Sequence, residues 1–398
     1  MAVLRIGDLR MHASAMPENI RRSIWAAGAA AGLLTLSACG SSARGERTPA
    51  AETSGAVASS GASSPASTST STNTNTNTNT SPAESPGTFT ISFAGDVHFA
   101  GRTAARLSAN PATAFGRSAA VLSKADLSMV NLETAIAVGG SAEGKTFTFQ
   151  APPAAFTALK DAGVDIATMA NNHGADYGAD GLSQTLAAIR SSGFPVVGIG
   201  ADATAAYAPY YTTVNGVRIA VVAASQVPDE TLVNFSATDD NPGIASAFSD
   251  RLLASVRAAK GKADVVIAYL HWGTEYDSCP NSDQRGLADR LAAAGVAAVV
   301  GTHAHVLQGA GWRPDGTYVA YGLGNYFWWR SFGNAQDDNG VLTLTIAHDR
   351  VRTADFSPSR LDDTGVSPPA TGAVARTILG EFTQATRCAD LSSTPPGH

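Results

Sequence analysis

Cysteine is scarce in this chain of 398 residues, which has only Cys39, Cys279 and Cys388. Three cysteines exclude a small fold stapled by several disulfides and a zinc site with four thiolate ligands. Basic residues are also few, because 27 Lys and Arg stand against 33 Asp and Glu and are scattered along the chain. The formal net charge of −6 and the lack of a basic block argue against a nucleic-acid partner.

The apolar run near the start of the chain, residues 24–36, is too short to span about 30 Å of hydrocarbon comfortably. Arg21 and Arg22 precede it, as in the hydrophobic region of a signal peptide. The following Leu-Ser-Ala-Cys at residues 36–39 resembles a bacterial lipobox, which implies acylation of Cys39 and removal of residues 1–38. We therefore expect an exported protein, lipid-anchored to the outer face of the bacterial cell membrane. A plain secretory signal or a single-pass anchor is the alternative.

Residues 39–87 have little with which to form a core. Of the 48 residues at positions 41–88, 22 are Ser or Thr and none is aromatic. Such a stretch cannot offset its ordering entropy by burial, so the composition predicts a Ser/Thr/Asn-rich disordered linker.

Short apolar runs alternate with amphipathic stretches in residues 88–398. Strands are expected at residues 89–94, 127–132, 164–169, 196–199, 217–224, 265–271, 297–301, 318–322 and 341–346. Helices are expected at residues 153–162, 182–191, 247–259 and 284–294. The alternation predicts one α/β domain, built on one sheet or on two.

Polar residues gather in blocks where these apolar runs end, and open α/β sheets bind ligands at the carboxyl ends of their strands. The blocks are Gly-Asp-Val-His at 95–98, Asn-Leu-Glu at 131–133, Asn-Asn-His at 171–173, His-Trp-Gly-Thr-Glu-Tyr at 271–276 and Gly-Thr-His-Ala-His at 301–305. They supply imidazole, carboxylate and amide groups without a thiolate, which suits Mn, Fe or Zn. A carboxylate such as Glu133 can bridge two ions about 3.5–4 Å apart. A single His-x-His is more often a surface or packing feature, but five blocks at strand ends predict a metal centre.

These blocks, with Tyr-Gly-Leu-Gly-Asn-Tyr at 321–326, resemble the CapA family of poly-γ-glutamate capsule-synthesis proteins, within the calcineurin-like metallophosphatase superfamily. The resemblance covers about residues 88–346 and implies a metallophosphatase-like α/β/β/α sandwich with two divalent ions. It implies one ion held by Asp96, His98, Glu133 and His305. It implies a second ion held by Glu133, Asn172, His271 and His303. The resemblance also implies that His173 is a catalytic histidine, which does not bind metal but assists departure of the leaving group.

Other residues of the same motifs are expected to orient the ligands or to touch the substrate: Asn131, Glu275, Tyr276 and Asn325. Glu275 could do either, by orienting His271 or by contacting substrate. Asp176 could orient His173 or cap a helix. The Trp-Trp-Arg run at 328–330 could be the edge of the core or a rim that binds an anionic polymer.

If Cys39 carries lipid, Cys279 and Cys388 are an even pair in an oxidising compartment. A disulfide between them is expected, with two free thiols too far apart to bridge as the alternative.

Three functions fit these observations. The first is a metal-dependent hydrolase that cuts a phosphoester or a γ-glutamyl amide in the synthesis or export of a poly-γ-glutamate capsule. The second is a non-catalytic accessory that binds the anionic cell-envelope polymer within a synthesis or export complex. The third is a general surface phosphodiesterase, which would share the site and differ in its pocket.

Overall fold

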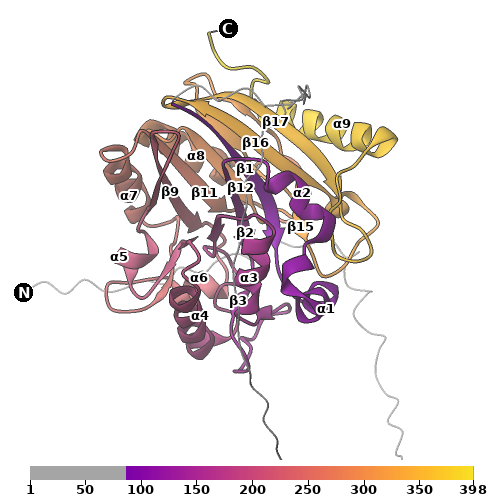
Figure 1. Cartoon of the computed structure of the whole chain (residues 1–398). Coiled ribbons are helices and arrows are strands. Elements are labelled where there is room, and N and C mark those ends of the chain that lie inside the picture. Colours follow the sequence, from indigo (N-terminus) through magenta and orange to yellow (C-terminus); the bar gives the residue numbers. More distant parts are fainter. Residues whose placement is uncertain (1–86, 398) are drawn as a thin grey trace, which may run out of the picture. The chain divides into compact units, whose positions relative to one another are not determined.

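The computed structural model describes residues 87–397 (Figure 1). The predicted signal segment 1–38, Cys39 and the linker up to residue 86 lie outside the described residues, so their assignments stay predictions. No helix among residues 87–397 has the length and hydrophobicity needed to cross a membrane.

The first large sheet has the strand order β17-β16-β1-β2-β5-β6, with β15 paired to the end of β1. Strands β1, β2, β5, β6 and β15 run parallel to one another, and β16 is antiparallel to both of its neighbours, β1 and β17. Their bounds are β1 Thr88–Val97, β2 Leu127–Leu132, β5 Ile166–Thr168, β6 Val196–Val197, β15 Asn325–Phe327, β16 Asp338–Ala347 and β17 Arg350–Arg360.

The second large sheet has the order β13-β14-β12-β11-β9-β8, with a parallel centre and antiparallel edges. Its strands are β8 Tyr210–Val214, β9 Val217–Ser225, β11 Val265–His271, β12 Ala298–Thr302, β13 Ala310–Trp312 and β14 Tyr318–Ala320. Short strand pairs join β3 Ala135–Ile136 to β4 Gln150–Ala151 and β7 Ile199–Gly200 to β10 Gly243–Ile244.

Helices connect and flank these strands (Figure 1). The α-helices are α1 Gly101–Ala109, α2 Ala119–Leu122, α3 Ala154–Asp161, α4 Gly178–Ser192, α5 Ala203–Ala206, α6 Glu230–Phe235, α7 Arg251–Lys260, α8 Ser282–Ala294 and α9 Gly372–Cys388. Short 3-10 helices are η2 Pro111–Thr113, η3 Gly116–Ser118 and η4 Ala335–Asp337. Local sequence sets several ends: Asn281 and Gln284 form a capping box on α8, and Gly295 ends it in the left-handed region.

The two large sheets pack face to face. Side chains alternate across each strand, so one face of the second sheet packs against the first sheet and the other face packs against helices. On β11, Val265, Ile267 and Tyr269 join the core cluster shared with the first sheet. Its alternate residues Val266, Ala268 and Leu270 join a second cluster with α7 and α8. Tyr269 ties the sheets directly, since its hydroxyl donates to the Ala94 carbonyl oxygen of β1 at 2.7 Å.

The predicted α/β class is confirmed, with two large mixed sheets and flanking helices in the described residues. The strand prediction for 196–199 is wrong in detail, because Gly198 at φ +85° divides it into β6 and β7. The helix predicted from residue 247 begins at Arg251 instead, after a turn in which Ser249 Oγ accepts from Arg251 N. The elements after residue 347, β17 and α9, were not predicted.

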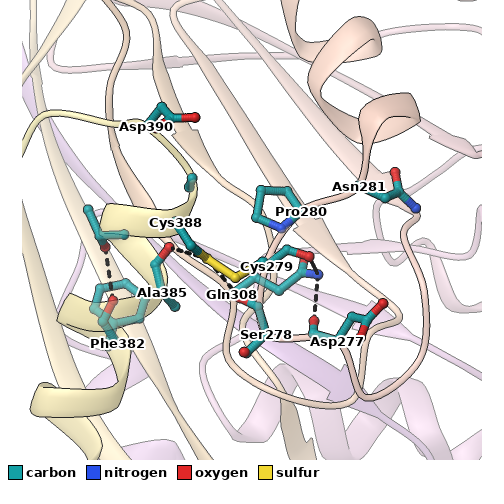
Figure 2. The surroundings of a disulfide bond; sticks show 12 residues. Asp277, Ser278, Cys279, Pro280, Asn281, Gln308, Phe382, Ala385, Cys388 and Asp390 are labelled. Atoms are coloured by element: carbon teal, nitrogen blue, oxygen red, sulfur yellow. Dashed lines mark hydrogen bonds between the residues drawn. A yellow bond between two sulfur atoms is a disulfide. The ribbon is translucent and has the colours of Figure 1, made fainter.

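Cys279 and Cys388 form a disulfide with their Cα atoms 5.8 Å apart (Figure 2). The bond joins the loop after β11 to the last residue of α9. Gln308 supports the same loop, because its Nε2 donates to the Asp277 carbonyl oxygen at 2.8 Å. Arg285 of α8 donates to the Ala389 carbonyl oxygen at 2.9 Å just beyond the disulfide. The loop that carries residues 275 and 276 is therefore anchored from two sides.

Gly95 is required by a close approach of two backbone segments. A Cβ added at Gly95 would lie 1.8 Å from the Gly324 carbonyl oxygen, which accepts from Asp96 N at 2.9 Å. We expect Gly95→Ala to lower the free energy of unfolding by about 3 kcal/mol or more, through overpacking that no side-chain rotation relieves. Urea unfolding followed by circular dichroism measures this.

The matched control is Gly286→Ala, in the exposed middle of α8, where an added Cβ meets nothing within 4 Å. This change should stabilise the chain by about 0.5–1 kcal/mol through helix propensity. Equal stability of Gly95→Ala and wild type would contradict the role given to Gly95.

Candidate metal centre

The predicted site residues lie where the parallel strands of both sheets end. Asp96 near the end of β1 is in register with Asn131 of β2, and His271 at the end of β11 is in register with Thr302 of β12. Parallel pairing brings the carboxyl ends of neighbouring strands to one edge of a sheet. The donors gathered there are all buried: Asp96, Glu133, Asn172, His271, His303 and His305.

Asp96 and His305 form the first part of the centre. Asp96 Oδ2 lies 3.4 Å from His305 Nδ1, which is also 2.9 Å from Asn325 Oδ1. Asn131 Nδ2 donates to Asp96 Oδ1 at 2.8 Å. Asn131 and Asn325 thus hold the Asp96 carboxylate and the His305 ring in place through these contacts, which use Nδ1 of His305 and not Nε2.

His271 lies at the middle of the second part. Its Nε2 atom is 2.8 Å from Asn172 Oδ1 and 3.1 Å from His303 Nδ1. Its Nδ1 atom is 3.1 Å from Thr302 Oγ1 and 3.2 Å from Asn131 Nδ2. The two rings and the amide oxygen therefore converge on one point.

Glu133 lies between the two parts. Its Oε1 atom is 3.5 Å from His271 Nε2 and is buried without a hydrogen-bond partner among the described residues. Donor atoms of Glu133, His303 and His305 lie within 4.8 Å of one another, as do those of Asp96, Glu133 and His271. A buried carboxylate oxygen without a donor is unfavourable unless a cation binds it. Imidazole, carboxylate and amide donors without sulfur suit a divalent ion such as Mn, Fe or Zn.

His98 differs from the other predicted ligands. Its Nε2 atom accepts from the Trp329 backbone N–H at 3.3 Å, and its ring packs 4.2 Å from Phe149 and 4.1 Å from Trp328. Neither group of converging donor atoms among residues 87–397 includes it. Its Nδ1 atom has no partner in the described part of the chain. His98 therefore lies beside the converging donors, against Phe149 and Trp328, with Nε2 bonded to the Trp329 amide.

His173 faces the centre from the block after β5. Its Nδ1 atom is 2.6 Å from Asp176 Oδ2, and its Nε2 atom is 3.9 Å from Glu133 Oε1. Asp176 therefore orients His173 and does not cap a helix, since α4 has Tyr177 at its N-cap position. Sequence reasoning missed Lys145, whose Nζ atom lies 2.8 Å from Asp176 Oδ1. Lys145 belongs to an irregular loop whose sequence has neither helical nor strand periodicity.

Burial and neighbouring charges shift the pKa values of the carboxyl and imidazole groups in the centre, some upward and some downward. Burial raises the pKa of Glu133 well above its usual value, and Asp96 adds to the effect. Burial also acts to raise the pKa of Asp96, but the bond and charge of His305 outweigh it and leave that pKa lowered. Burial acts to lower the pKa of His305, and Asp96 outweighs it to leave that pKa raised. Burial lowers the pKa of His271 and His303 well below the usual value, so both rings are neutral near pH 7.

The loops that carry these groups are locally strained. His303 has φ 95°, His305 has φ 56° and Tyr276 has φ 69°, all in the left-handed region that non-glycine residues seldom adopt. The Tyr276 backbone N–H donates to the Ala304 carbonyl oxygen at 2.8 Å, between the two histidines. The surrounding loops thus hold an unfavourable backbone conformation that aims both imidazoles inward.

A hollow opens beside the centre, with His173 and His305 in its lining. Most of its wall is aromatic: Phe147, Phe149, Tyr276, Trp328, Trp329 and Phe332. Arg330 is the only Lys or Arg among the residues that line it. Glu275 lines it as well and is exposed, so it faces the hollow and does not bond His271. Of the 328–330 run, Trp328 is buried and Arg330 is at the rim.

The described residues thus form an α/β protein with two packed sheets and a buried donor cluster suited to divalent ions. The family model described as "Bacterial capsule synthesis protein PGA_cap" matches residues 90–328, and the chain belongs to this family.

Two curated relatives are 34% identical to the chain. One is the capsule biosynthesis protein CapA of Bacillus anthracis, over 202 residues that cover 48% of each protein. The other is the PGA biosynthesis protein CapA of Bacillus subtilis, over 180 residues that cover 45% of this chain and 46% of that protein. A Mycobacterium tuberculosis protein named "probable polyglutamine synthesis accessory protein" is 31% identical over 206 residues, 48% of this chain and 53% of that protein. The chain spans about half the length of the curated relatives it matches.

Solved structures are more distant. A phosphatase from Mycoplasma pneumoniae has a TM-score of 0.46 at 17% identity, covering 69% of this chain and 95% of that one. The NAD nucleotidase of Haemophilus influenzae has a TM-score of 0.40 at 14% identity, covering 77% and 57%.

The raised pKa of Glu133 predicts how stability depends on pH. Without metal, folded Glu133 keeps its proton above pH 4.5 while the unfolded chain loses it, so the contribution of Glu133 to the free energy of unfolding should fall as pH rises. Below pH 6.5 the neutral His271 and His303 contribute in the opposite direction, so the Glu133 contribution is read as the difference between wild type and Glu133→Gln. The slope from this one proton is at most about 1.4 kcal/mol per pH unit. Adding Mn²⁺ should reverse the trend, because binding requires the carboxylate. Thermal unfolding from pH 5 to 8, in chelator or in Mn²⁺, measures both effects.

Glu133→Gln should remove this part of the slope and the stabilisation by Mn²⁺. Glu230→Gln, at an exposed position on α6, is the matched control and should keep both. An unchanged slope in Glu133→Gln would show that another group is responsible.

Proposed function

We propose that the chain is a metal-dependent hydrolase of the metallophosphatase type that acts in the synthesis or export of a poly-γ-glutamate capsule. The observation that carries the proposal is the Glu133 Oε1 atom, buried without a partner among residues 87–397 and surrounded by converging donors. Membership of a capsule synthesis family supports the pathway. The bond cut would be a phosphoester or a γ-glutamyl amide.

The residues that would hold two divalent ions are Asp96, Glu133, Asn172, His271, His303 and His305, with His98 beside them. Two bound ions would supply Lewis-acid chemistry, activating water and polarising the oxygen of the ester or amide. The chain itself supplies the proton donor. Asp176 holds Nδ1 of His173, which leaves Nε2 facing the centre as the atom that protonates the leaving group.

Arg330 is the residue best placed to recognise an anionic substrate. Its guanidinium carbon lies 4.4 Å from the centre of the Trp329 ring and 4.7 Å from that of Phe332, so two aromatic rings fix it at the rim. A guanidinium held in this way pairs with a phosphate or a carboxylate. The aromatic wall beside it would exclude water from the bond being cut.

Export and a lipid anchor at Cys39 on the outer face of the cell membrane belong to the same proposal. The Leu-Ser-Ala-Cys sequence at residues 36–39 supports them. The Cys279–Cys388 disulfide fits an oxidising compartment and so supports export.

A non-catalytic accessory in a polyglutamate synthesis complex is the second candidate. The word "accessory" in the name of the mycobacterial relative favours it. Such a protein would keep its metal and bind the polymer without turnover.

The first test of the hydrolase is a comparison of variants in the purified full chain. Metal content and hydrolysis of phosphomonoesters, phosphodiesters and poly-γ-glutamate are measured with Mn, Fe and Zn. Glu133→Ala should lose both metal and activity. His173→Ala should keep its metal and lose about 10²–10⁴-fold in kcat, the usual contribution of a general acid.

His348→Asn, at an exposed turn, is the histidine control and should behave as wild type. A wild-type chain without bound metal would rule out the centre. Bound metal without turnover of any substrate would favour the accessory.

Substrate recognition by Arg330 is tested with Arg330→Gln. Its KM for an anionic substrate should rise about 10-fold, the ~1.4 kcal/mol of one charge-assisted hydrogen bond, with kcat nearly unchanged. Arg117→Gln, an exposed arginine of η3, is the control. If no substrate turns over, calorimetric binding of a poly-γ-glutamate oligomer gives the same comparison. Equal affinities in the two variants would contradict the role of Arg330.

A further inference from the structure

Lys145 is a buried lysine in the loop between β3 and β4, with 8% of its side chain exposed. Its Nζ atom lies 2.8 Å from Asp176 Oδ1, 3.0 Å from Thr231 Oγ1 and 3.3 Å from Asp229 Oδ2. It also donates to the carbonyl oxygen of Asn172. The ammonium group therefore connects its own loop to the block after β5 and to the start of α6.

The loop that carries Lys145 holds Asp176 at several atoms. Glu143 N donates to the Asp176 carbonyl oxygen at 2.8 Å, and Phe149 N donates to Asp176 Oδ2 at 2.7 Å. Lys145 takes the other carboxylate oxygen, Oδ1. The Phe149 ring also packs against His173, with centroids 4.6 Å apart. Together these contacts fix the carboxylate that orients the His173 ring.

Lys145 also holds the backbone of Asn172. The Asn172 carbonyl oxygen accepts from Lys145 and, at 2.6 Å, from Thr231 Oγ1. The side chain of the same residue lies 2.8 Å from His271 Nε2. One ammonium group thus lies behind both Asn172 and the Asp176–His173 pair.

We propose that Lys145 is a positioning residue of the candidate metal centre, which fixes Asn172 directly and His173 through Asp176. Its effect on turnover rests on the proposed hydrolase function, whereas its effect on the placement of Asn172 and His173 does not. A buried ammonium is tolerated only when it is paired, and here two carboxylates and two oxygen acceptors satisfy it. Without it, Asp176 keeps an uncompensated buried charge and is free to turn away from His173.

The test compares Lys145→Met and Lys145→Arg with wild type in the purified full chain. Lys124→Met removes an exposed lysine and is the matched control. Mn²⁺ affinity is measured by competition with a chelating dye. The Nδ1–H resonance of His173 is measured by NMR in the metal-free protein and assigned by its loss in His173→Gln. Hydrolysis is measured with aryl and alkyl phosphodiesters. An aryl leaving group departs with little need of a proton, whereas an alkyl leaving group must be protonated.

Lys145→Met should bind Mn²⁺ about 10–100-fold more weakly, the usual effect of removing a group that orients a ligand. The His173 Nδ1–H resonance should shift or disappear. The kcat for the alkyl diester should fall at least about 10-fold more than for the aryl diester, because only the alkyl leaving group depends on the acid. Lys145→Arg should recover part of each effect, and Lys124→Met should show none.

A purely structural salt bridge would instead lower both kcat values equally and leave the resonance in place. If wild type cleaves neither diester, the hydrolase function fails for these substrates and Lys145 is judged on Mn²⁺ affinity and the resonance. Affinity within twofold of wild type together with an unchanged resonance in Lys145→Met would overturn the proposal. If Lys145→Met does not fold, Lys145→Arg decides by the same two measurements. Weaker Mn²⁺ binding with a shifted resonance, both smaller than a full loss, supports the proposal, and wild-type values for both overturn it.

Discussion

The Oε1 atom of Glu133 lies at the ends of two packed sheets, fully buried and without a donor among residues 87–397. Burial and the charge of Asp96 oppose its ionisation. The Asn131 amide donates to Asp96 Oδ1 at 2.8 Å and to the other oxygen of Glu133, Oε2, at 3.4 Å. Around Oε1 itself lie His271 and His303, whose pKa values are lowered so that both rings are neutral. Such an arrangement is unfavourable without a cation and would become favourable with one, so under the proposed function metal binding and stability would be linked.

The scaffold brings the donors together through backbone contacts. Register pairing of β1 with β2 and of β11 with β12 aligns the strand ends, and Tyr269 ties one sheet to the other below them. Gly95 lets the β1 end touch Gly324, whose neighbour Asn325 orients His305. The left-handed conformations of His303 and His305 are then imposed by packed surroundings that cannot relax. Precision at the centre therefore depends on rigid strands more than on the loops that carry the ligands.

The sequence predicts those features that follow one pattern, an apolar strand that ends at a block of polar residues. Strands β2 and β11 have the predicted bounds, because their apolar runs end sharply at polar blocks. Six of the seven predicted ligands converge for the same reason. His98 does not: its ring packs against Phe149 and Trp328 and its Nε2 atom accepts from the distant Trp329 N–H, contacts that no local pattern reveals. Lys145 was missed because its role comes from contacts with residues 27, 31 and 86 positions away. The helix α9 was missed because only Ile378 and Ala385 are buried along its 17 residues.

The charges around the centre limit how a polyanion could bind under the proposed function. Lys145 is not available to bind a polyanion, because Asp176 and Asp229 already pair with its ammonium group. Among the residues that line the hollows beside the centre, Arg330 is then the remaining full cation, opposed by Glu275. One guanidinium can pair with one phosphate or carboxylate, whereas gripping a polymer with a charge on every unit requires a row of cations. The aromatic wall adds apolar contact near the centre and no further charge. This balance favours recognition of a single anionic group next to the bond to be cut, such as the end of a polymer, over binding along the length of the polymer.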